Sequence, residues 1–375
     1  MTHYNNQSTD IKQVNRHNIF RLLWLEKQSK KTIMEQLGLS LPTVTQNIEE
    51  LMAEGLVIED GQFKSTGGRG AKAYIVNSKA RHAIGIDINS EHLAVVVMDL
   101  SGEIVAHQRQ LFHSQELDTY YQLANEIINQ LLTQEKIKRN ELLGIGVSLQ
   151  GMVSEDQQRV VYGPLMNLHN QKLSLAKDYL PDASAFFHDA DSAAFAEKWL
   201  RPELINALYL SLSTNLGGAL IINQEIVAGN HFMAGKVEHM TLIPNGLPCY
   251  CGQRGCAEVY CSVQALIGKT TANDLASFFE LVEEQDQLAL QTLESYLSYL
   301  SILLNNLFML TDSEIILGGY MASFLAPYLD CLKEKSYERS SLPETWDYIQ
   351  LAYYQHEPIA AGAALYYVND YLETI

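Results

Sequence analysis

The sequence predicts an α/β protein in which a small helical head precedes a duplicated, two-lobed body. Apolar residues recur at helical spacing through residues 12–54, whereas the short apolar runs typical of strands begin at Ala83. The charge changes at the same place: residues 1–80 hold 10 Lys and Arg against 8 Asp and Glu, and the remainder holds 16 against 36. A slightly basic head on a strongly acidic body keeps one end of the chain compatible with nucleic acid.

A repeated strand pattern indicates that the body is duplicated. Three strands separated by tight turns occur twice, at residues 83–88, 93–100 and 103–108 and again at residues 207–212, 217–222 and 225–227. Helical stretches at residues 117–134 and 288–310 supply the covering layers. We therefore expect three parts: a head at residues 1–80, a first lobe at 81–195 completed by a C-terminal helix at 357–375, and a second lobe at 196–356. A cleft between two lobes is a common place for a small ligand.

The head carries the pattern of a helix-turn-helix. Amphipathic helices are predicted at residues 12–28 and 31–37, Gly38 suits the left-handed end of the second, and Ser40 suits the N-cap of a third at residues 41–54. The third helix is expected to bury four apolar side chains: Val44, Ile48, Leu51 and Met52. Four polar side chains then face the base edges of the major groove: Thr43, Thr45, Gln46 and Asn47. A plain helical hairpin is the alternative.

The segment after the third helix predicts a wing. A β-hairpin turning at Asp60-Gly61 is followed by a Gly-Gly-Arg-Gly stretch and a strand at residues 73–76. Together these make a winged helix-turn-helix, whose Arg69 would enter a narrow minor groove unless it is only a solvated loop residue. The expected partner is an A·T-rich inverted-repeat operator, read by a homodimer or tetramer.

The composition and the first residues bear on the cellular location of the protein, and on whether its cysteines bind a metal or form disulfides. No apolar run approaches the roughly 18 residues that span a bilayer, and the first residues are polar without the apolar stretch of a signal peptide. We therefore expect a cytoplasmic protein without a membrane partner. Three of its five cysteines cluster, which in this setting favours a metal over disulfides.

The clustered cysteines predict one structural zinc ion per chain. The ligands would be His239, Cys249, Cys251 and Cys256, in the pattern H-x9-C-x-C-G-x-x-G-C. Three thiolates and one imidazole make a closed tetrahedral set that leaves no position for an activated water. Three buried free cysteines are the alternative.

The body resembles the ROK family (repressors, open reading frames and kinases), and the head resembles that of its repressor branch. The resemblance implies a hexokinase/actin-like, ribonuclease H-like ATPase-type fold. Family kinases carry a phosphate turn G-x-D-x-G-G-T, which reads Gly85-Ile-Asp-Ile-Asn-Ser-Glu91 here, and the second phosphate loop at residues 213–219 is half kept. Glu91 would repel a triphosphate, so we expect no kinase activity.

The same resemblance implies a set of ligand-binding residues. The family's N-D-A-N segment reads His188-Asp-Ala-Asp191, in which Asp189 stands where active kinases have their catalytic base. The implied set is Asn167, His188, Asp189, Lys236, His239 and Glu258. Lys236 replaces a family carboxylate, so it either contacts an anionic ligand or pairs with a neighbour such as Glu238.

These observations predict a DNA-binding transcriptional regulator, a repressor of carbohydrate-utilisation genes, that binds a sugar or sugar derivative between its lobes. Two alternatives stay open. One is a glucokinase-like sugar kinase with an added regulatory head, and Asp87 and Asp189 keep it open. The other is a DNA-binding scaffold that answers to a protein partner.

Overall fold

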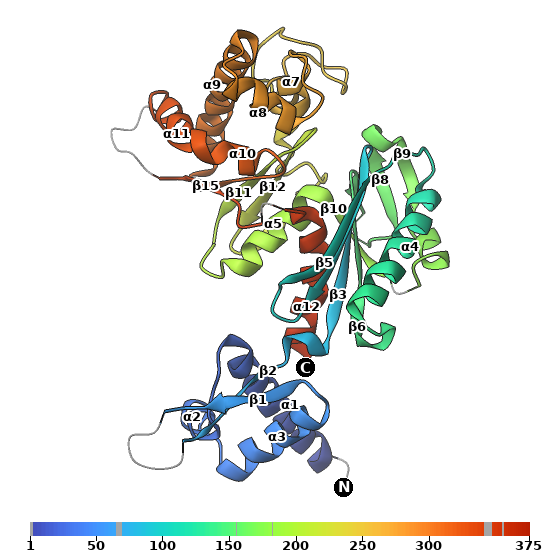
Figure 1. Ribbon diagram of the computed structural model, residues 1–375, viewed down its shortest axis with the longest axis vertical. Helices are drawn as coiled ribbons and strands as arrows, with labels where there is room; N and C mark the ends of the chain where they lie inside the picture. The colour runs from blue at the N-terminus through green and yellow to red at the C-terminus, as the bar shows by residue number, and fades with distance from the viewer. Residues whose placement is uncertain (1–2, 65–69, 155, 182, 341–346, 355) are drawn as a thin grey trace.

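The head lies below two α/β lobes in the computed structural model (Figure 1). The structure describes residues 3–64, 70–154, 156–181, 183–340, 347–354 and 356–375. Among the helices it describes, none combines the length and apolar character needed to cross a bilayer.

Three helices and a two-stranded sheet form the head: α1 (His3–Leu25), α2 (Lys30–Leu37), α3 (Leu41–Ala53), β1 (Val57–Gln62) and β2 (Lys72–Val76). The predicted turn between α2 and α3 is confirmed, because Gly38 ends α2 at φ 65° and Ser40 accepts the Thr43 amide at the start of α3. Met52, which we expected to be buried, is 37% exposed. It follows the last buried position of α3, Leu51.

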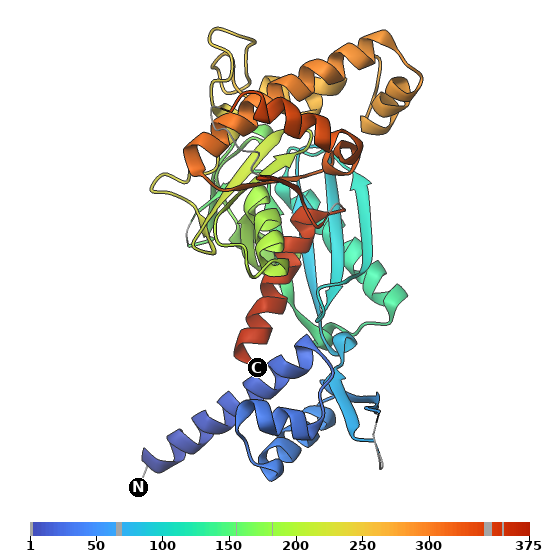
Figure 2. The ribbon, with the colours of Figure 1, turned by 90° about the vertical axis from the view of Figure 1, so that its left-hand side faces the viewer.

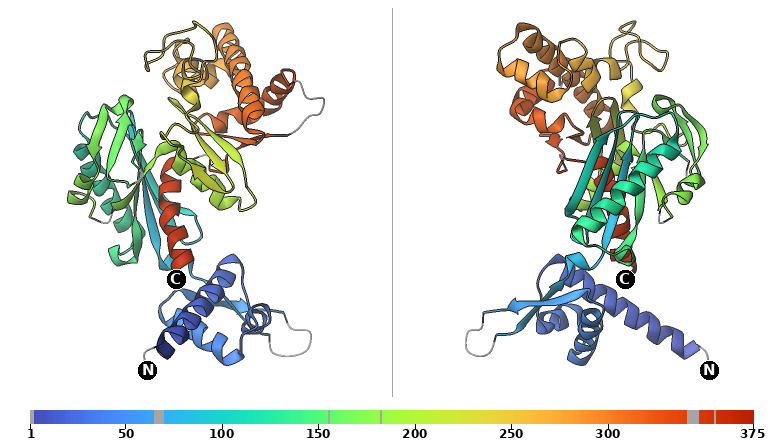
Figure 3. Two further views of the ribbon diagram at one scale, coloured as in Figure 1. Left: turned by 180° about the vertical axis from the view of Figure 1, so that it is seen from behind. Right: turned by 45° about the vertical axis from the view of Figure 1, so that its right-hand side comes forward.

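The wing differs from its prediction at Asp60-Gly61, where no hairpin turn forms. Strand β1 continues through this pair, and Gly61 at φ 83° accommodates a shift in the register between β1 and β2. Pairing between the two segments of the wing continues beyond Gly61, where the Phe63 amide donates to the Ala71 carbonyl. Arg69 lies outside the described residues. The hairpin and α1 extend in opposite directions from the head (Figure 3).

Each lobe contains a five-stranded sheet of the same topology. The first sheet has the order β10-β6-β3-β4-β5 and the second β15-β14-β11-β12-β13, in which three antiparallel strands continue into parallel ones. The strands of the first sheet are β3 (His82–Ile88), β4 (His92–Asp99), β5 (Ile104–Leu111), β6 (Leu142–Leu149) and β10 (Ala183–His188). Those of the second are β11 (Ala207–Leu212), β12 (Leu216–Ile222), β13 (Glu225–Val227), β14 (Glu314–Gly318) and β15 (Ile349–Leu351). The predicted duplication is therefore confirmed.

A small third sheet and several helices complete the lobes. The sheet joins β7 (Met152–Val153), β8 (Arg159–Gly163) and β9 (Leu168–Lys172) on the first lobe. Helix α4 (Leu117–Glu135) packs on the outer face of the first sheet. The second lobe carries α6 (Glu258–Cys261), α7 (Val263–Ile267), α8 (Leu275–Glu283), α9 (Gln287–Thr311), α10 (Ala322–Leu325) and α11 (Leu329–Tyr337).

Two helices, α5 (Asp189–Leu200) and α12 (Pro358–Thr374), cross between the sheets (Figure 1). Alanines of α5 pack on the second sheet and those of α12 on the first, and the two helices touch at Gly362, where an added Cβ would lie 1.8 Å from the Ser192 carbonyl oxygen. The boundary expected at residue 195 falls inside α5, which therefore belongs to both lobes.

The head is anchored to the far ends of these two helices (Figure 2). The Trp24 ring packs edge-on against Trp199 of α5 at 5.5 Å between centroids, and its indole N–H donates to the Leu100 carbonyl. Phe20 packs against Tyr371 of α12 at 6.3 Å. One hydrophobic cluster runs from the head into the first lobe.

We expect Gly362→Ala to destabilise the protein, because the added methyl group collides with backbone that has no room to move. The free energy of unfolding should fall by about 1–3 kcal/mol or more. Gly217→Ala is the control, since its Cβ would meet no atom closer than 3.6 Å. Denaturant unfolding of both variants measures the difference, and equal midpoints would contradict the importance of this contact.

Candidate functional site

A cavity lies between the two lobes and is named here the interlobe cavity. Its walls come from the β3–β4 turn, the N-terminus of α5, the loop before β12 and the segment after β13. Polar and charged residues make up more than half of its lining, and a concave site between lobes suits a small ligand with hydrogen-bonding groups.

Three predicted ligand-binding residues form a chain across one end of the cavity. The Lys236 ammonium donates to His188, with 2.9 Å between Nζ and Nδ1, and His188 Nε2 lies 3.2 Å from Asp189 Oδ1. Burial and the nearby Lys236 charge lower the pKa of His188 to about 3, so its ring is neutral. Lys236 Nζ also lies 3.1 Å from Nε2 of the same ring, so the lysine contacts both nitrogens of the neutral imidazole. Of the two alternatives left open for Lys236, the structure shows pairing with a neighbour, and that neighbour is His188.

Two buried carboxyl groups at the same end keep their protons to a higher pH than usual, so they can donate as well as accept hydrogen bonds. Burial raises the pKa of Asp189 to about 6 and that of Glu238 to about 7. Glu238 Oε2 is buried and has no hydrogen-bond partner among the described residues. This oxygen has almost no exposed surface, and an unpaired buried polar atom of this kind costs free energy.

Two predicted ligand-binding residues do not line this cavity. Glu258 is 4% exposed, and its two oxygens accept from the Asn215 side chain at 2.9 Å and the Leu216 amide at 2.7 Å. It fixes the loop before β12 instead. Asn167 is exposed, at φ 55°, and ends a short helix at Pro164–Met166. The predicted set therefore reduces here to His188, Asp189, Lys236 and His239.

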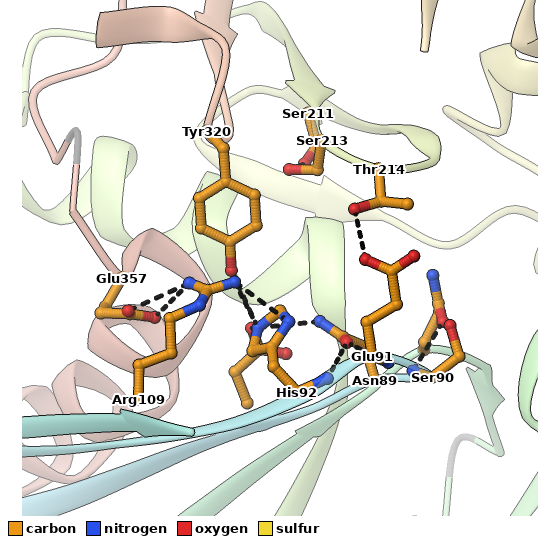
Figure 4. Close-up of polar contacts among 12 residues, drawn as sticks. Asn89, Ser90, Glu91, His92, Arg109, Ser211, Ser213, Thr214, Tyr320 and Glu357 are labelled. Carbon is orange, nitrogen blue, oxygen red and sulfur yellow. Dashed lines mark hydrogen bonds and ion pairs between the residues drawn. The ribbon is translucent and has the colours of Figure 1, made fainter. Parts of the chain in front are cut away.

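At the other end of the cavity the two phosphate-loop segments bind each other (Figure 4). Thr214 of the second lobe donates to Glu91 of the first at 2.8 Å. Gln150 joins the same segments, because it donates to Asn215 at 3.1 Å and accepts from the Ser90 amide at 3.3 Å. The carboxylate at Glu91 thus engages the opposite lobe.

An arginine-centred cluster, which the sequence analysis missed, bridges the lobes beside these contacts (Figure 4). The Arg109 guanidinium lies 3.9 Å from the centre of the Tyr320 ring, donates to Glu357 at 3.0 Å and contacts His92 at 2.8 Å. His92 lies 3.0 Å from Asp87 and 2.9 Å from the Tyr320 hydroxyl. These residues come from four separated segments. Asp87 belongs to the phosphate-turn motif, whereas no local motif marks the other four.

The predicted metal ligands converge. One ligand atom from each of His239, Cys249, Cys251 and Cys256 lies within 4.8 Å of the others. Tight backbone turns bring them together: Gly252 and Gly255 adopt φ 86° and 79°, and a Cβ on Gly255 would lie 1.8 Å from the Ile243 carbonyl oxygen. Burial raises the pKa of the Cys249 and Cys256 thiols, whereas hydrogen bonds from the Gln253 backbone and the neighbouring thiols lower that of Cys251. The cluster can hold a metal ion.

The exposed face of α3 carries part of the predicted DNA-reading set. Gln46 is exposed, and Thr43 and Thr45 are half-buried. Asn47 is only 3% exposed and donates to the Thr43 carbonyl of its own helix at 2.9 Å. The prediction that Asn47 reads bases is therefore wrong, because this position faces the core with Val44 and Ile48.

Comparison with known proteins places these features in a family. Residues 83–368 match the profile of the ROK family. The xylose repressor of Bacillus subtilis is 27% identical over an alignment of 378 residues, which covers 98% of this chain and 98% of the repressor. The DNA-binding transcriptional dual regulator NagC of Escherichia coli is 27% identical over 260 residues, 68% of this chain and 64% of NagC.

Solved structures agree on the fold. A ROK family transcriptional regulator, a homolog of the E. coli MLC protein, superposes with a TM-score of 0.72 and 20% identity over 96% of both chains. A ROK family glucokinase from Streptomyces griseus, in complex with glucose and AMPPNP, superposes with a TM-score of 0.65 and 20% identity. The glucokinase match covers 98% of that chain but 76% of this one. The actin-like ATPase fold predicted for the body is confirmed.

We expect the purified protein to contain about one metal ion per chain, and Cys251→Ser to lose it, because a structural site needs all four ligands. Elemental analysis and thermal unfolding measure metal content and stability, and the variant should unfold at lower temperature. Cys331→Ser is the control, since Cys331 is exposed and outside the cluster. A metal-free wild type that unfolds at the same temperature after chelation would contradict the prediction.

Proposed function

Since the chain belongs to the ROK family, we propose that it is a sugar-responsive transcriptional repressor of carbohydrate-utilisation genes. The observation that carries the proposal is the combination of a winged helix-turn-helix with an interlobe cavity on one chain. Similarity to xylose repressors along the full length supports it. We place its action in the cytoplasm, where operator DNA and imported sugar meet.

The sugar would bind at the end of the interlobe cavity that holds Asp189 and Glu238, whose carboxyl groups face it. His239 lines the same wall and also belongs to the metal cluster. We propose that the metal is a structural Zn²⁺, one per chain. The 3.7 Å between the Cys251 and Cys256 sulfur atoms supports this, because two thiolates on one tetrahedral zinc lie about 3.8 Å apart.

A sugar kinase remains the second candidate, because Asp87 and Asp189 occupy their family positions. Two contacts disfavour it. Glu91 adds a negative charge to the phosphate turn and binds Thr214, and Arg109 with Tyr320 bridges the lobes beside it. A nucleotide would have to displace these contacts. Sugar-dependent ATP turnover by the purified protein would identify the kinase.

We propose that sugar binding reaches the DNA-binding head through α5 and α12. Their N-termini meet the cavity: Asp189 begins α5, and Ile359 in the first turn of α12 lines the wall. Their other ends hold the head through Trp199 and Tyr371. Lobe closure around a sugar would therefore move two helices that the head rests on. Coupling of this kind amounts to about 1–3 kcal/mol and acts equally in both directions.

The operator is expected to be an A·T-rich inverted repeat read by a two-fold homodimer or tetramer. Selection from random DNA should recover such a repeat, and a sugar from a panel that includes xylose and N-acetylglucosamine should weaken its binding. Gln46→Ala should relax preference at one base pair by about 1–3 kcal/mol. Gln36→Ala, an exposed glutamine on α2, is the control and should leave base preference unchanged. No specific DNA binding by the wild type would overturn the proposed function.

We expect Trp199→Ala to uncouple the two sites while each still binds its ligand. A sugar that changes operator affinity about 5- to 150-fold in the wild type should change it little in the variant. Fluorescence anisotropy with labelled operator, with and without saturating sugar, measures this ratio. Trp199→Phe keeps an aromatic contact with Trp24 and should retain coupling. An unchanged ratio in Trp199→Ala would contradict a route through α5.

A further inference from the structure

A second hollow adjoins the interlobe cavity and is named here the outer cavity. It lies between β7 and β10 of the first lobe and residues 228–236 of the second, with an empty volume of about 1280 Å³. Met152, His188 and Lys236 line both hollows. The His188–Lys236 pair therefore stands at the boundary of two adjoining spaces, both of which are formed between the lobes.

The lining of the outer cavity suits a sugar ring. Phe187 and Phe232 supply aromatic surface, and the Phe187 ring is held against Tyr366 at 5.0 Å between centroids. Polar groups stand beside them, including the amides of Gln157 and Asn230. Apolar surface with a few polar groups of both hydrogen-bonding kinds binds a ligand that has apolar faces and a hydroxyl rim.

The charged residues around both hollows favour a neutral ligand over an anionic one. Lys236 is the single Lys or Arg among the described residues that line them, and its ammonium is already engaged with His188 at 2.9 Å. The carboxyl groups of Asp189, Asp191 and Glu238 lie on the same walls. A phosphate or carboxylate on the ligand would face these groups with one committed cation to offset them.

We propose that the effector is a neutral disaccharide. Its first ring lies in the interlobe cavity beside Asp189, and its second ring lies in the outer cavity against Phe187 and Phe232. The His188–Lys236 pair contacts the linkage between the rings. This inference rests on the proposed function, in which a sugar binds between the lobes, and it adds the size and charge of that sugar.

Isothermal titration of the full-length protein tests the proposal with matched pairs of sugars. Each pair contains a monosaccharide and its disaccharide: xylose and xylobiose, glucose and cellobiose or maltose, N-acetylglucosamine and chitobiose. The 6-phosphates of glucose and N-acetylglucosamine are added as anionic probes. One disaccharide should bind at least about tenfold more tightly than its monosaccharide and than either phosphate.

A variant that fills the outer cavity separates this subsite from the first. Ala228 is exposed and lines the outer cavity alone, so Ala228→Trp should abolish the gain from the second ring and leave the affinity for the monosaccharide unchanged. His231→Trp is the control, because His231 is exposed on the same segment but lines neither hollow. Thermal unfolding of both variants checks that they are folded.

Three results would each overturn the proposal that the effector is a disaccharide. They are equal affinity for the monosaccharide and its disaccharide, tighter binding of a sugar phosphate, and an Ala228→Trp variant that keeps the extra affinity for the disaccharide. Tight binding of a monosaccharide alone would do so while leaving the proposed function standing. If no sugar of either length binds, the proposed function fails and the inference fails with it.

Discussion

The close packing of α12 on α5 and on the first sheet is the constraint on which the rest of the molecule depends. Gly362 lets α12 touch the Ser192 backbone, and Gly85 of β3 leaves room for the Ala360 carbonyl, which would lie 1.8 Å from an added Cβ. With no side chain at these points, the helices approach within backbone contact. The crossing helices pack against both sheets, contribute to the cavity wall at their N-termini and contact the head at their other ends.

The two ends of the cleft between the lobes differ in what occupies them. Side-chain contacts between the lobes occupy the end at Glu91, whereas the end at Asp189 is open to a ligand. Side chains from opposite lobes pair at the phosphate end, as Glu91 does with Thr214 and Arg109 with Tyr320. These contacts hold the two lobes together at this end of the cleft. At the other end, Glu238 Oε2 has no hydrogen-bond partner within the described part of the chain.

The metal cluster and the loop before β12 are tied to the same region. His239 belongs to the His/Cys cluster and to the cavity wall, so a metal ion held by the cluster would fix one side of the cavity. Glu258 lies two residues after Cys256, the last cysteine of the cluster. It holds the loop before β12 by accepting hydrogen bonds from Asn215 and Leu216. A rigid support of this kind positions a ligand without contacting it.

Sequence alone determined what local periodicity and spacing encode. The helix-turn-helix, the repeated strands and the His/Cys set were all predicted, because each is set by residues near one another in the chain. The sequence-based predictions were wrong where the conformation of a residue depends on a neighbour that is distant in the chain. Gln46 and Asn47 are adjacent and similar in chemistry, yet packing turned one toward solvent and the other inward. Gly61 made a bulge because the partner strand extended past it.

The candidate site shows the same division. Family spacing predicted Asp189 and Lys236, but only the fold revealed that Lys236 meets His188, 48 residues away, or that Arg109 meets Glu357, 248 residues away. Such contacts depend on how two lobes close over a helix pair. Their energies come from burial and from charges brought within hydrogen-bond distance. No pattern along the chain specifies those distances, so the tertiary structure alone decided them.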